Sequence, residues 1–283
     1  MPSRGDDLYR PAVMRVAAVQ MCSTPDKVRN LATAGKLVGE AVDAGASLVA
    51  LPELFNLWGT ARELREGAEP LDGPSITWAR DLAANRSITL LAGSIVERSE
   101  RDGEHLHNMS CLIDPRGEIV ATYRKIHLFD VDVPGAIHRE SATITAGNEV
   151  VVADAGPLCI GMATCYDLRF PELFREHLAR GANTVVLPSA FTAATGKDHW
   201  EPLLRARAIE NQVFVIAPDQ RGSSTDKLHW HGRSMILDPW GVALATAPDR
   251  DCWIAADLDL DAQHRIRTTL PSDDHRRPDI FGD

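Results

Sequence analysis

The chain lacks three features that mark large classes of protein. No apolar run is long enough to span a membrane, and the polar opening MPSRGDDLYRP is not a signal peptide. Positive charge is scarce, because 30 Lys and Arg residues face 40 Asp and Glu residues and leave a net charge of −10. This balance argues against general nucleic-acid binding and against an anionic membrane surface as a partner. It is compatible with an anionic small substrate, which needs only one or two local cations.

Cysteine pairs are also missing. The five cysteines are scattered, with no C-x-x-C spacing: Cys22, Cys111, Cys159, Cys165 and Cys252. Such a set is typical of a reducing compartment and not of a zinc finger. We therefore expect a cytoplasmic protein without a structural metal site.

Several common catalytic motifs are absent. The chain has no G-x-S-x-G elbow and no G-x-G-x-x-G loop. Gly196-Lys197 imitates the end of a phosphate-binding loop, but Phe191 stands where that loop needs a glycine. The HWH sequence at 229–231 could chelate a metal, but it lies in a polar stretch that predicts a loop with two solvated histidines.

Short apolar runs alternate with helix-like stretches along the chain. Helices between short apolar strands indicate an α/β protein. The expected strands are 13–20, 48–51, 88–96, 158–164, 184–188, 213–217, 233–238, 242–246 and 252–257, with a hairpin at 109–124. The expected helices are 25–42, 75–85 (with Ser75 as its cap), 171–180 and 198–211.

Two segments occur twice, in the same order. Residues 45–55 and 181–191 share six of eleven positions, and residues 110–122 and 234–246 share six of thirteen. These matches indicate two halves of one design, each a helix–strand–hairpin unit. We expect two sheets packed face to face with helices outside. This would be one domain behind a loose N-terminal tail, residues 1–11.

Cys165 stands where the apolar run 158–164 gives way to a helix that begins near Pro171. At such a turn the sulfur can meet solvent, and nearby backbone N–H groups can favour the thiolate. Cys165 is therefore a candidate nucleophile. The alternative is a small core hydrophobe, which free cysteines usually are.

Glu53 and Lys125 are the partners that such a nucleophile needs. Glu53 follows a strand and a proline, where the second half carries Ser189, and Lys125 ends the first hairpin. A solvated glutamate and a snorkelling lysine are the alternatives. A carboxylate can take the thiol proton and pass it to the leaving amine, while an ammonium and the N–H of Tyr166 hold the oxyanion.

Three ordered motifs carry a resemblance to a known family. LPELF around Glu53, YRKIHLFD around Lys125 and TCYDLRFPELF around Cys165 resemble the signatures of the nitrilase superfamily of carbon–nitrogen hydrolases, over about residues 14–282. The resemblance implies a four-layer α-β-β-α sandwich and a thioester mechanism without metal or organic cofactor. It makes Glu53 the general base, Lys125 the oxyanion stabiliser and Cys165 the nucleophile. Glu140 matches a further glutamate that stands beside the lysine.

Other stretches resemble one branch of that superfamily. HLFDVDVPG at 127–135 is similar to the branch that contains omega-amidase and deaminated-glutathione amidase, and the segments 189–212 and 275–282 lean toward the latter. The chain departs from the branch at Gly232-Arg233-Ser234, where G-H-S is usual, and in the loop 220–231. These departures can alter the choice of substrate without touching the three catalytic positions.

The branch implies a small, anionic, alpha-keto-acid-type amide as substrate and a homodimer or larger homo-oligomer as the assembly. A substrate carboxylate calls for a local cation, for which Arg169 and the loop residues Lys197 and Arg233 are candidates. An ion pair of Arg169 with Asp167 or Glu172 is the alternative. Three other functions stay open: an omega-amidase on alpha-ketoglutaramate, an N-carbamoyl amino acid hydrolase, and a catalytically idle scaffold.

Overall fold

The structure, a computed structural model, describes residues 13–99, 105–133, 136–225 and 228–281, so the tail expected at 1–11 lies outside the described residues. Two six-stranded sheets face one another. The first has the order β16 (Cys252–Asp259), β1 (Val13–Gln20), β2 (Leu48–Ala50), β3 (Thr89–Arg98), β4 (Leu106–Ile113), β5 (Ile119–Arg124). The second has the order β8 (Val152–Ala155), β9 (Leu158–Met162), β10 (Thr184–Val186), β11 (Phe214–Ala217), β14 (Met235–Leu237), β15 (Ala243–Thr246).

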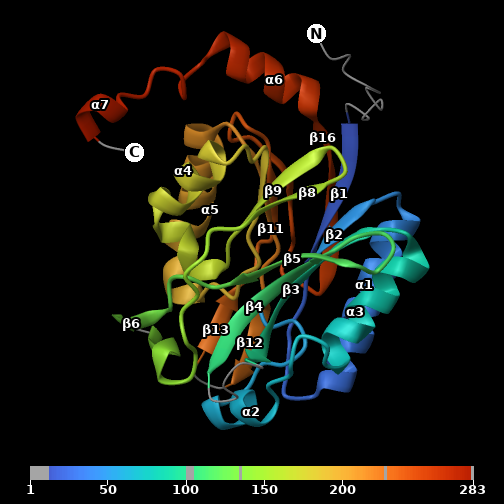
Figure 1. The fold of residues 1–283 in the computed structure, drawn as a ribbon. Helices are drawn as coiled ribbons and strands as arrows, with labels where there is room; N and C mark the ends of the chain where they lie inside the picture. Colours follow the sequence, from blue (N-terminus) through green and yellow to red (C-terminus); the bar gives the residue numbers. More distant parts are fainter. Residues whose placement is uncertain (1–12, 100–104, 134–135, 226–227, 282–283) are drawn as a thin grey trace.

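Helices cover the outer face of each sheet (Figure 1). The first sheet carries α1 (Lys27–Asp43) and α3 (Pro74–Arg86), and the second carries α4 (Pro171–Ala179) and α5 (Ala193–Asn211). The expected α-β-β-α sandwich is therefore confirmed. The remaining elements are α2 (Ala61–Glu66), α6 (Leu260–Thr269), α7 (Pro278–Phe281), the short 3₁₀ helices η1 (Glu140–Ala142) and η2 (Cys165–Arg169), and the hairpins β6 (Asp130–Val133) with β7 (Ala136–Arg139) and β12 (Arg221–Thr225) with β13 (Leu228–His231). Among these described helices, none is long and apolar enough to cross a membrane.

The internal repeat of the sequence is visible in the structure. Each sheet places three parallel strands side by side, β1-β2-β3 in the first and β9-β10-β11 in the second. Gly45 and Gly181 enter β2 and β10 with φ of 93° and 90°, and Gly117 and Gly241 turn the two outer hairpins with φ of 81° and 83°. These left-handed conformations favour glycine, which explains why both repeats keep it there.

One strand that follows the second half in sequence belongs to the first sheet. β16 follows the second half in sequence but pairs antiparallel with β1 at the edge of the first sheet, where Val13 lies opposite Asp259. The edge strand of the first sheet therefore comes from a segment that follows the whole second half in sequence.

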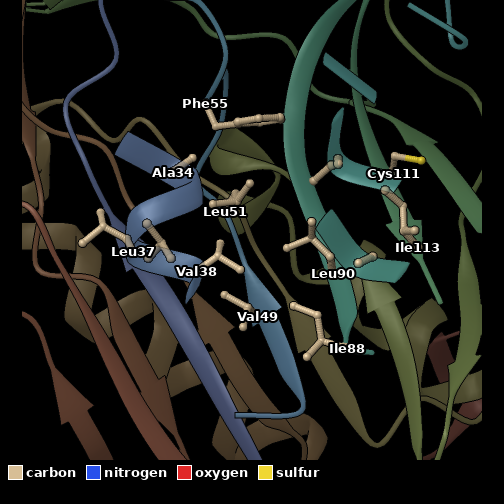
Figure 2. Packing of buried hydrophobic residues seen from close by; sticks show 14 of the residues in the cluster. Ala34, Leu37, Val38, Val49, Leu51, Phe55, Ile88, Leu90, Cys111 and Ile113 are labelled. Carbon is tan, nitrogen blue, oxygen red and sulfur yellow. The ribbon is translucent and has the colours of Figure 1, made fainter. Parts of the chain in front are cut away.

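Three apolar layers hold the sandwich together. The inner layer lies between the sheets and includes Val16, Leu48, Ile160, Phe214 and Ile236. The outer layers lie between each sheet and its helices. Figure 2 shows one of them, in which side chains of α1 such as Leu37 and Val38 meet Val49 and Leu51 of the first sheet. Strands that are apolar on both faces, such as β2, are what this double burial requires.

Three local predictions were wrong. Ser75 is not the cap of α3, because Gly73 holds that position and the Ser75 hydroxyl donates to Glu69 inside the protein. α5 begins at Ala193 and not at 198, so Lys197 lies on a helix. Gly196 allows this part of α5 to pack closely on His231, since a Cβ there would collide with the ring of that histidine.

The HWH sequence is the third correction, because it lies in strand β13 instead of a loop. Trp230 is buried against Trp58, with ring centroids 4.3 Å apart, and His231 is half-buried against α5. Only His229 has the exposed side chain that was expected of both histidines.

The close approach of other backbone atoms to Gly93 of β3 leads to a prediction about stability. A Cβ there would collide with the backbone carbonyl oxygens of Leu51 and Pro52, which lead to Glu53. Gly93→Ala should lower the free energy of unfolding by at least about 2 kcal/mol, because backbone cannot yield as a flexible side chain can. Gly39→Ala is the matched control: Gly39 lies in α1 with open space around it, so alanine should stabilise by up to about 1 kcal/mol. Urea unfolding of both variants checks this, and equal midpoints would contradict it.

Candidate active site

Glu53, Lys125 and Cys165 come together at one end of the sandwich. Glu53 follows β2 and Lys125 follows β5 in the first sheet, while Cys165 follows β9 in the second. All three are buried, with 3%, 2% and 6% of their surface exposed. Strand ends from two facing sheets can place such groups together because the rigid sheets fix both sides of the site.

The ammonium of Lys125 lies between two carboxyl groups. Its Nζ donates to Glu53 Oε1 at 3.0 Å and to Glu140 Oε2 at 2.8 Å. Glu140 is held in turn by the N–H of Phe129 at 2.7 Å. The structure therefore brings Glu140 to the place beside the lysine that the sequence resemblance implied.

Burial and charge act in opposite directions on this group. Burial by itself lowers the pKa of Lys125, but the carboxylates of Glu140 and Glu53 outweigh it and hold that pKa well above its ordinary value. Burial by itself raises the pKa of Glu140, and the Lys125 ammonium outweighs it and lowers that pKa. The lysine is thus a fixed positive charge in a water-poor site.

Asn108 completes the network and was missed in the sequence. Its Nδ2 donates to Glu53 Oε1 at 2.7 Å and to Glu140 Oε1 at 3.1 Å, so one amide holds both carboxyl groups. The feature of the sequence that could have indicated Asn108 is a polar amide within the buried strand LHNMSCLI. The second sheet also contributes, because the N–H of Ala190 donates to Glu53 Oε2 at 2.8 Å.

Cys165 sits on a strained turn. Its φ of 47° is left-handed, which a residue with a side chain adopts only when the surroundings impose it. Its own N–H donates to the carbonyl of Pro188 at 2.9 Å. The turn continues as η2, a 3₁₀ helix that the sequence did not predict.

Asp167 is the residue that fixes this turn. Its carboxylate, which is fully buried, accepts the N–H of Thr164 at 2.8 Å and the hydroxyl of Tyr123 at 2.7 Å. It also accepts the N–H and Nδ1 of His127, at 3.0 and 2.7 Å. Because Tyr123 and His127 flank Lys125 in sequence, Asp167 ties the lysine segment directly to the cysteine segment.

The expected direction of the Cys165 pKa was wrong. Burial raises the pKa of this thiol well above its ordinary value, and the nearby Glu53 raises it further, while Lys125 acts in the opposite direction without prevailing. The thiol is therefore the resting form. A neutral thiol needs a base at the moment of attack, which a preformed thiolate would not require.

The N–H of Tyr166 is the backbone donor that was expected from the sequence beside Cys165. It follows Cys165 at the start of η2, and among the described residues it has no hydrogen-bond acceptor. Its ring stands edge-on to those of Phe129 and Phe170, at centroid distances of 5.1 and 5.4 Å. These contacts hold the ring of Tyr166, the residue that follows Cys165, between two other aromatic rings.

The three cations expected to bind substrate are placed differently. Arg169 is half-buried, with its guanidinium 5.8 Å from the ring centre of Tyr166 and 5.1 Å from that of Phe191, and it donates to His199 Nδ1 at 3.1 Å. No ion pair joins it to an acidic group of the described residues. Lys197 is 70% exposed and lies 3.9 Å from Asp198.

Arg233 also differs from the expectation of a site cation. Its side chain is exposed, and its backbone carbonyl accepts the indole N–H of Trp200 at 2.8 Å. Its φ of 58° marks a tight turn. Arg233 therefore has a visible structural task, whereas Arg169 is the candidate cation that borders the cysteine turn.

Asp219 is a second buried acid that the sequence did not suggest. Its side chain has no exposed surface, and its Oδ1 accepts the N–H of Phe191 at 2.9 Å. Its Oδ2 has no hydrogen-bond partner among the described residues. Among the same residues, no three His, Cys, Asp or Glu side chains are grouped to hold a metal ion.

Known proteins are similar to this chain in sequence and in fold. The carbon–nitrogen hydrolase family model matches residues 15–267. The deaminated glutathione amidase of Synechocystis sp. (strain PCC 6803 / GT-S) is 42% identical over 92% of this chain and 97% of its own, and the omega-amidase NIT2 of Xenopus tropicalis is 39% identical over 95% and 97%. The structure of Saccharomyces cerevisiae Nit3, a nitrilase-superfamily protein, superposes with a TM-score of 0.84 at 30% identity, covering 95% of this chain and 97% of that one. The chain belongs to the carbon–nitrogen hydrolase family.

Proposed function

We propose that this enzyme is a cysteine-dependent amidase that cleaves the linear amide of a small anionic acid, most like deaminated glutathione amidase. The observation that carries the proposal is the Lys125 ammonium held between Glu53 and Glu140 beside the neutral thiol of Cys165. It supplies a nucleophile, a base and a fixed positive charge in one buried place. The relatives with the corresponding names support the reaction class.

The proposed first half of the reaction makes a thioester. Glu53 takes the S–H proton as the sulfur of Cys165 attacks the amide carbon, and the carbonyl oxygen becomes an oxyanion. Lys125 and the N–H of Tyr166 stabilise that oxyanion. The carbon–nitrogen bond then breaks, and the leaving nitrogen takes the proton from Glu53 and departs as ammonia.

The second half hydrolyses the thioester. Glu53, again a carboxylate, takes a proton from water as the water oxygen attacks the thioester carbon. The carbon–sulfur bond breaks, and the sulfur of Cys165 recovers a proton from Glu53. The product is the carboxylic acid, and neither a metal nor an organic cofactor takes part in this proposal.

An alpha-keto-acid-type substrate places a carboxylate at the far end from the amide. Arg169 is the best-supported partner, because it borders the cysteine turn and carries no acidic partner in the part of the chain that is described. Omega-amidase activity on alpha-ketoglutaramate is the main alternative and needs the same cation. An N-carbamoyl amino acid hydrolase or an idle scaffold are the others.

Further parts of the proposal concern the molecule as a whole. Residues 12–283 would form one domain, which the shared apolar layer between the sheets supports. A cytoplasmic location and a homodimer or larger homo-oligomer follow from the cysteine usage and from the family resemblance. Its partner would be a small amide.

Removing the nucleophile tests the reaction class. Cys165→Ala should abolish ammonia release from omega-amides of short keto acids, whereas Cys22→Ser should keep it, because Cys22 is half-exposed and hydrogen-bonds only a surface carbonyl. An enzyme-coupled ammonia assay measures both. Turnover by Cys165→Ala would refute the mechanism. Carbon dioxide release alongside ammonia from an N-carbamoyl amino acid would favour that hydrolase, and no turnover of any amide would favour the scaffold.

Glu53→Gln separates basicity from shape. The amide can keep the contact to the Ala190 N–H through its oxygen but cannot take a proton, so kcat should fall on the order of 10²-fold or more. Single-turnover kinetics measure the acylation step directly. A rate within a few-fold of wild type would transfer the role to another base, with Glu140 the first to be tested by Glu140→Gln.

Arg169→Met tests the anionic substrate. A charge-assisted contact to a carboxylate is worth roughly 1.5–3 kcal/mol, so KM for the acid should rise about tenfold or more, with little change for its uncharged methyl ester. Lys197→Met is the matched control, because the Lys197 side chain is 70% exposed and its loss should not affect KM. If the wild-type enzyme cleaves the amide bond of the methyl ester as efficiently as that of the free acid, the enzyme is a general aliphatic amidase.

A further inference from the structure

Two acids of the site are held by consecutive backbone amides. The N–H of Ala190 donates to Glu53 at 2.8 Å, and the N–H of Phe191 donates to Asp219 at 2.9 Å. Neighbouring amides of one chain fix both carboxyl groups in the same part of the fold. Glu53 and Asp219 are therefore close enough to influence each other's charge.

The strand register brings Asp219 to the cysteine as well. Met162, Val186 and Ile216 lie side by side on parallel strands β9, β10 and β11. Cys165, Ser189 and Asp219 each follow three residues later, and Ser189 and Asp219 are paired in a parallel bridge. Asp219 therefore lies two strands from Cys165, about 10 Å between backbones.

Only one of the two acids has a cation. Lys125 lies 3.0 Å from Glu53, while no ion pair joins Asp219 to any described residue. Two carboxylates in such proximity do not both ionise readily, so the one without a cation keeps its proton. Burial raises the pKa of Asp219 well above its ordinary value, and the charge of Glu53 raises it further, while the N–H groups of Phe191, Gln220 and Gly232 lower it without prevailing.

We propose that Asp219 is a positioning residue of the active site that remains a neutral carboxylic acid while Glu53 is ionised, and that its ionisation at alkaline pH suppresses the reactivity of Cys165. The neutral form holds the Phe191 amide without adding charge. The ionised form places a second negative charge near the sulfur, which disfavours the thiolate. It would also repel an anionic substrate.

The other charged groups around Asp219 do not offset this charge. The ammonium of Lys125 is already shared by two carboxylates. Gly232, whose N–H lies close to the Asp219 carboxyl, is flanked by His231 and Arg233. The Arg233 side chain is exposed, and the half-buried His231 has a lowered pKa because of burial and so stays neutral at alkaline pH.

Alkylation of Cys165 by iodoacetamide tests the inference without turnover. Rate constants are measured from pH 6 to pH 10 by mass spectrometry of the Cys165 peptide, for wild type and Asp219→Asn, which keeps the shape but cannot ionise. The ratio of variant to wild-type rate should rise about tenfold across this range, since a one-unit pKa change is tenfold in thiolate. Asp154→Asn, which removes an exposed charge on β8, should show a constant ratio.

A ratio for Asp219→Asn that is constant from pH 6 to pH 10 overturns the proposal. If that variant does not fold, infrared spectroscopy of wild type decides: the carbonyl stretch of a protonated carboxyl should be present at pH 7 and lost toward pH 10, and its absence at pH 7 overturns the proposal. The inference concerns the site of the proposed function. Because alkylation needs no substrate, a wrong substrate assignment and a wrong role for Asp219 remain distinguishable.

Discussion

The buried ammonium of Lys125 is the constraint around which the site is built. A charge in a water-poor place is stable only with partners that satisfy it, and Glu53 and Glu140 provide them. Both carboxyl groups accept further hydrogen bonds: Asn108 donates to each of them, the N–H of Phe129 donates to Glu140, and the N–H of Ala190 donates to Glu53. The need to satisfy one buried cation thus explains why polar groups from separate strands of both sheets meet at this place.

The two halves of the chain are alike in path but not in chemistry. At the end of β2 the first half carries Glu53, and at the end of β10 the second half carries Ser189. The second half provides hydrogen-bond donors to Glu53. The N–H of Ala190 donates to its carboxylate, and Gln220 donates to its backbone carbonyl at 2.9 Å. One functional site therefore arises at the junction of two similar units because each contributes what the other lacks.

From the sequence we predicted those members of the candidate site that a local pattern indicates. Glu53, Lys125 and Cys165 each interrupt or follow an apolar run, and the repeated segments indicated two facing sheets. Asn108 and Asp219 were not predicted, because their hydrogen-bond partners lie far away in the chain and no local sequence pattern indicates such contacts. The pKa of Cys165 was expected in the wrong direction because a strand-to-helix turn indicates donors but not the depth of burial, which prevails here.

The pairing of β16 with β1 has a consequence for how the chain is made. Val13 and Asp259 lie far apart in the sequence, so during synthesis one edge of β1 stays unpaired until β16 has left the ribosome. Contacts of such sequence separation slow folding, and an unpaired apolar edge can pair with the wrong chain. The nascent enzyme is thus exposed to aggregation for longer than its stable native sandwich suggests, and truncation before β16 leaves the first sheet without its closing strand.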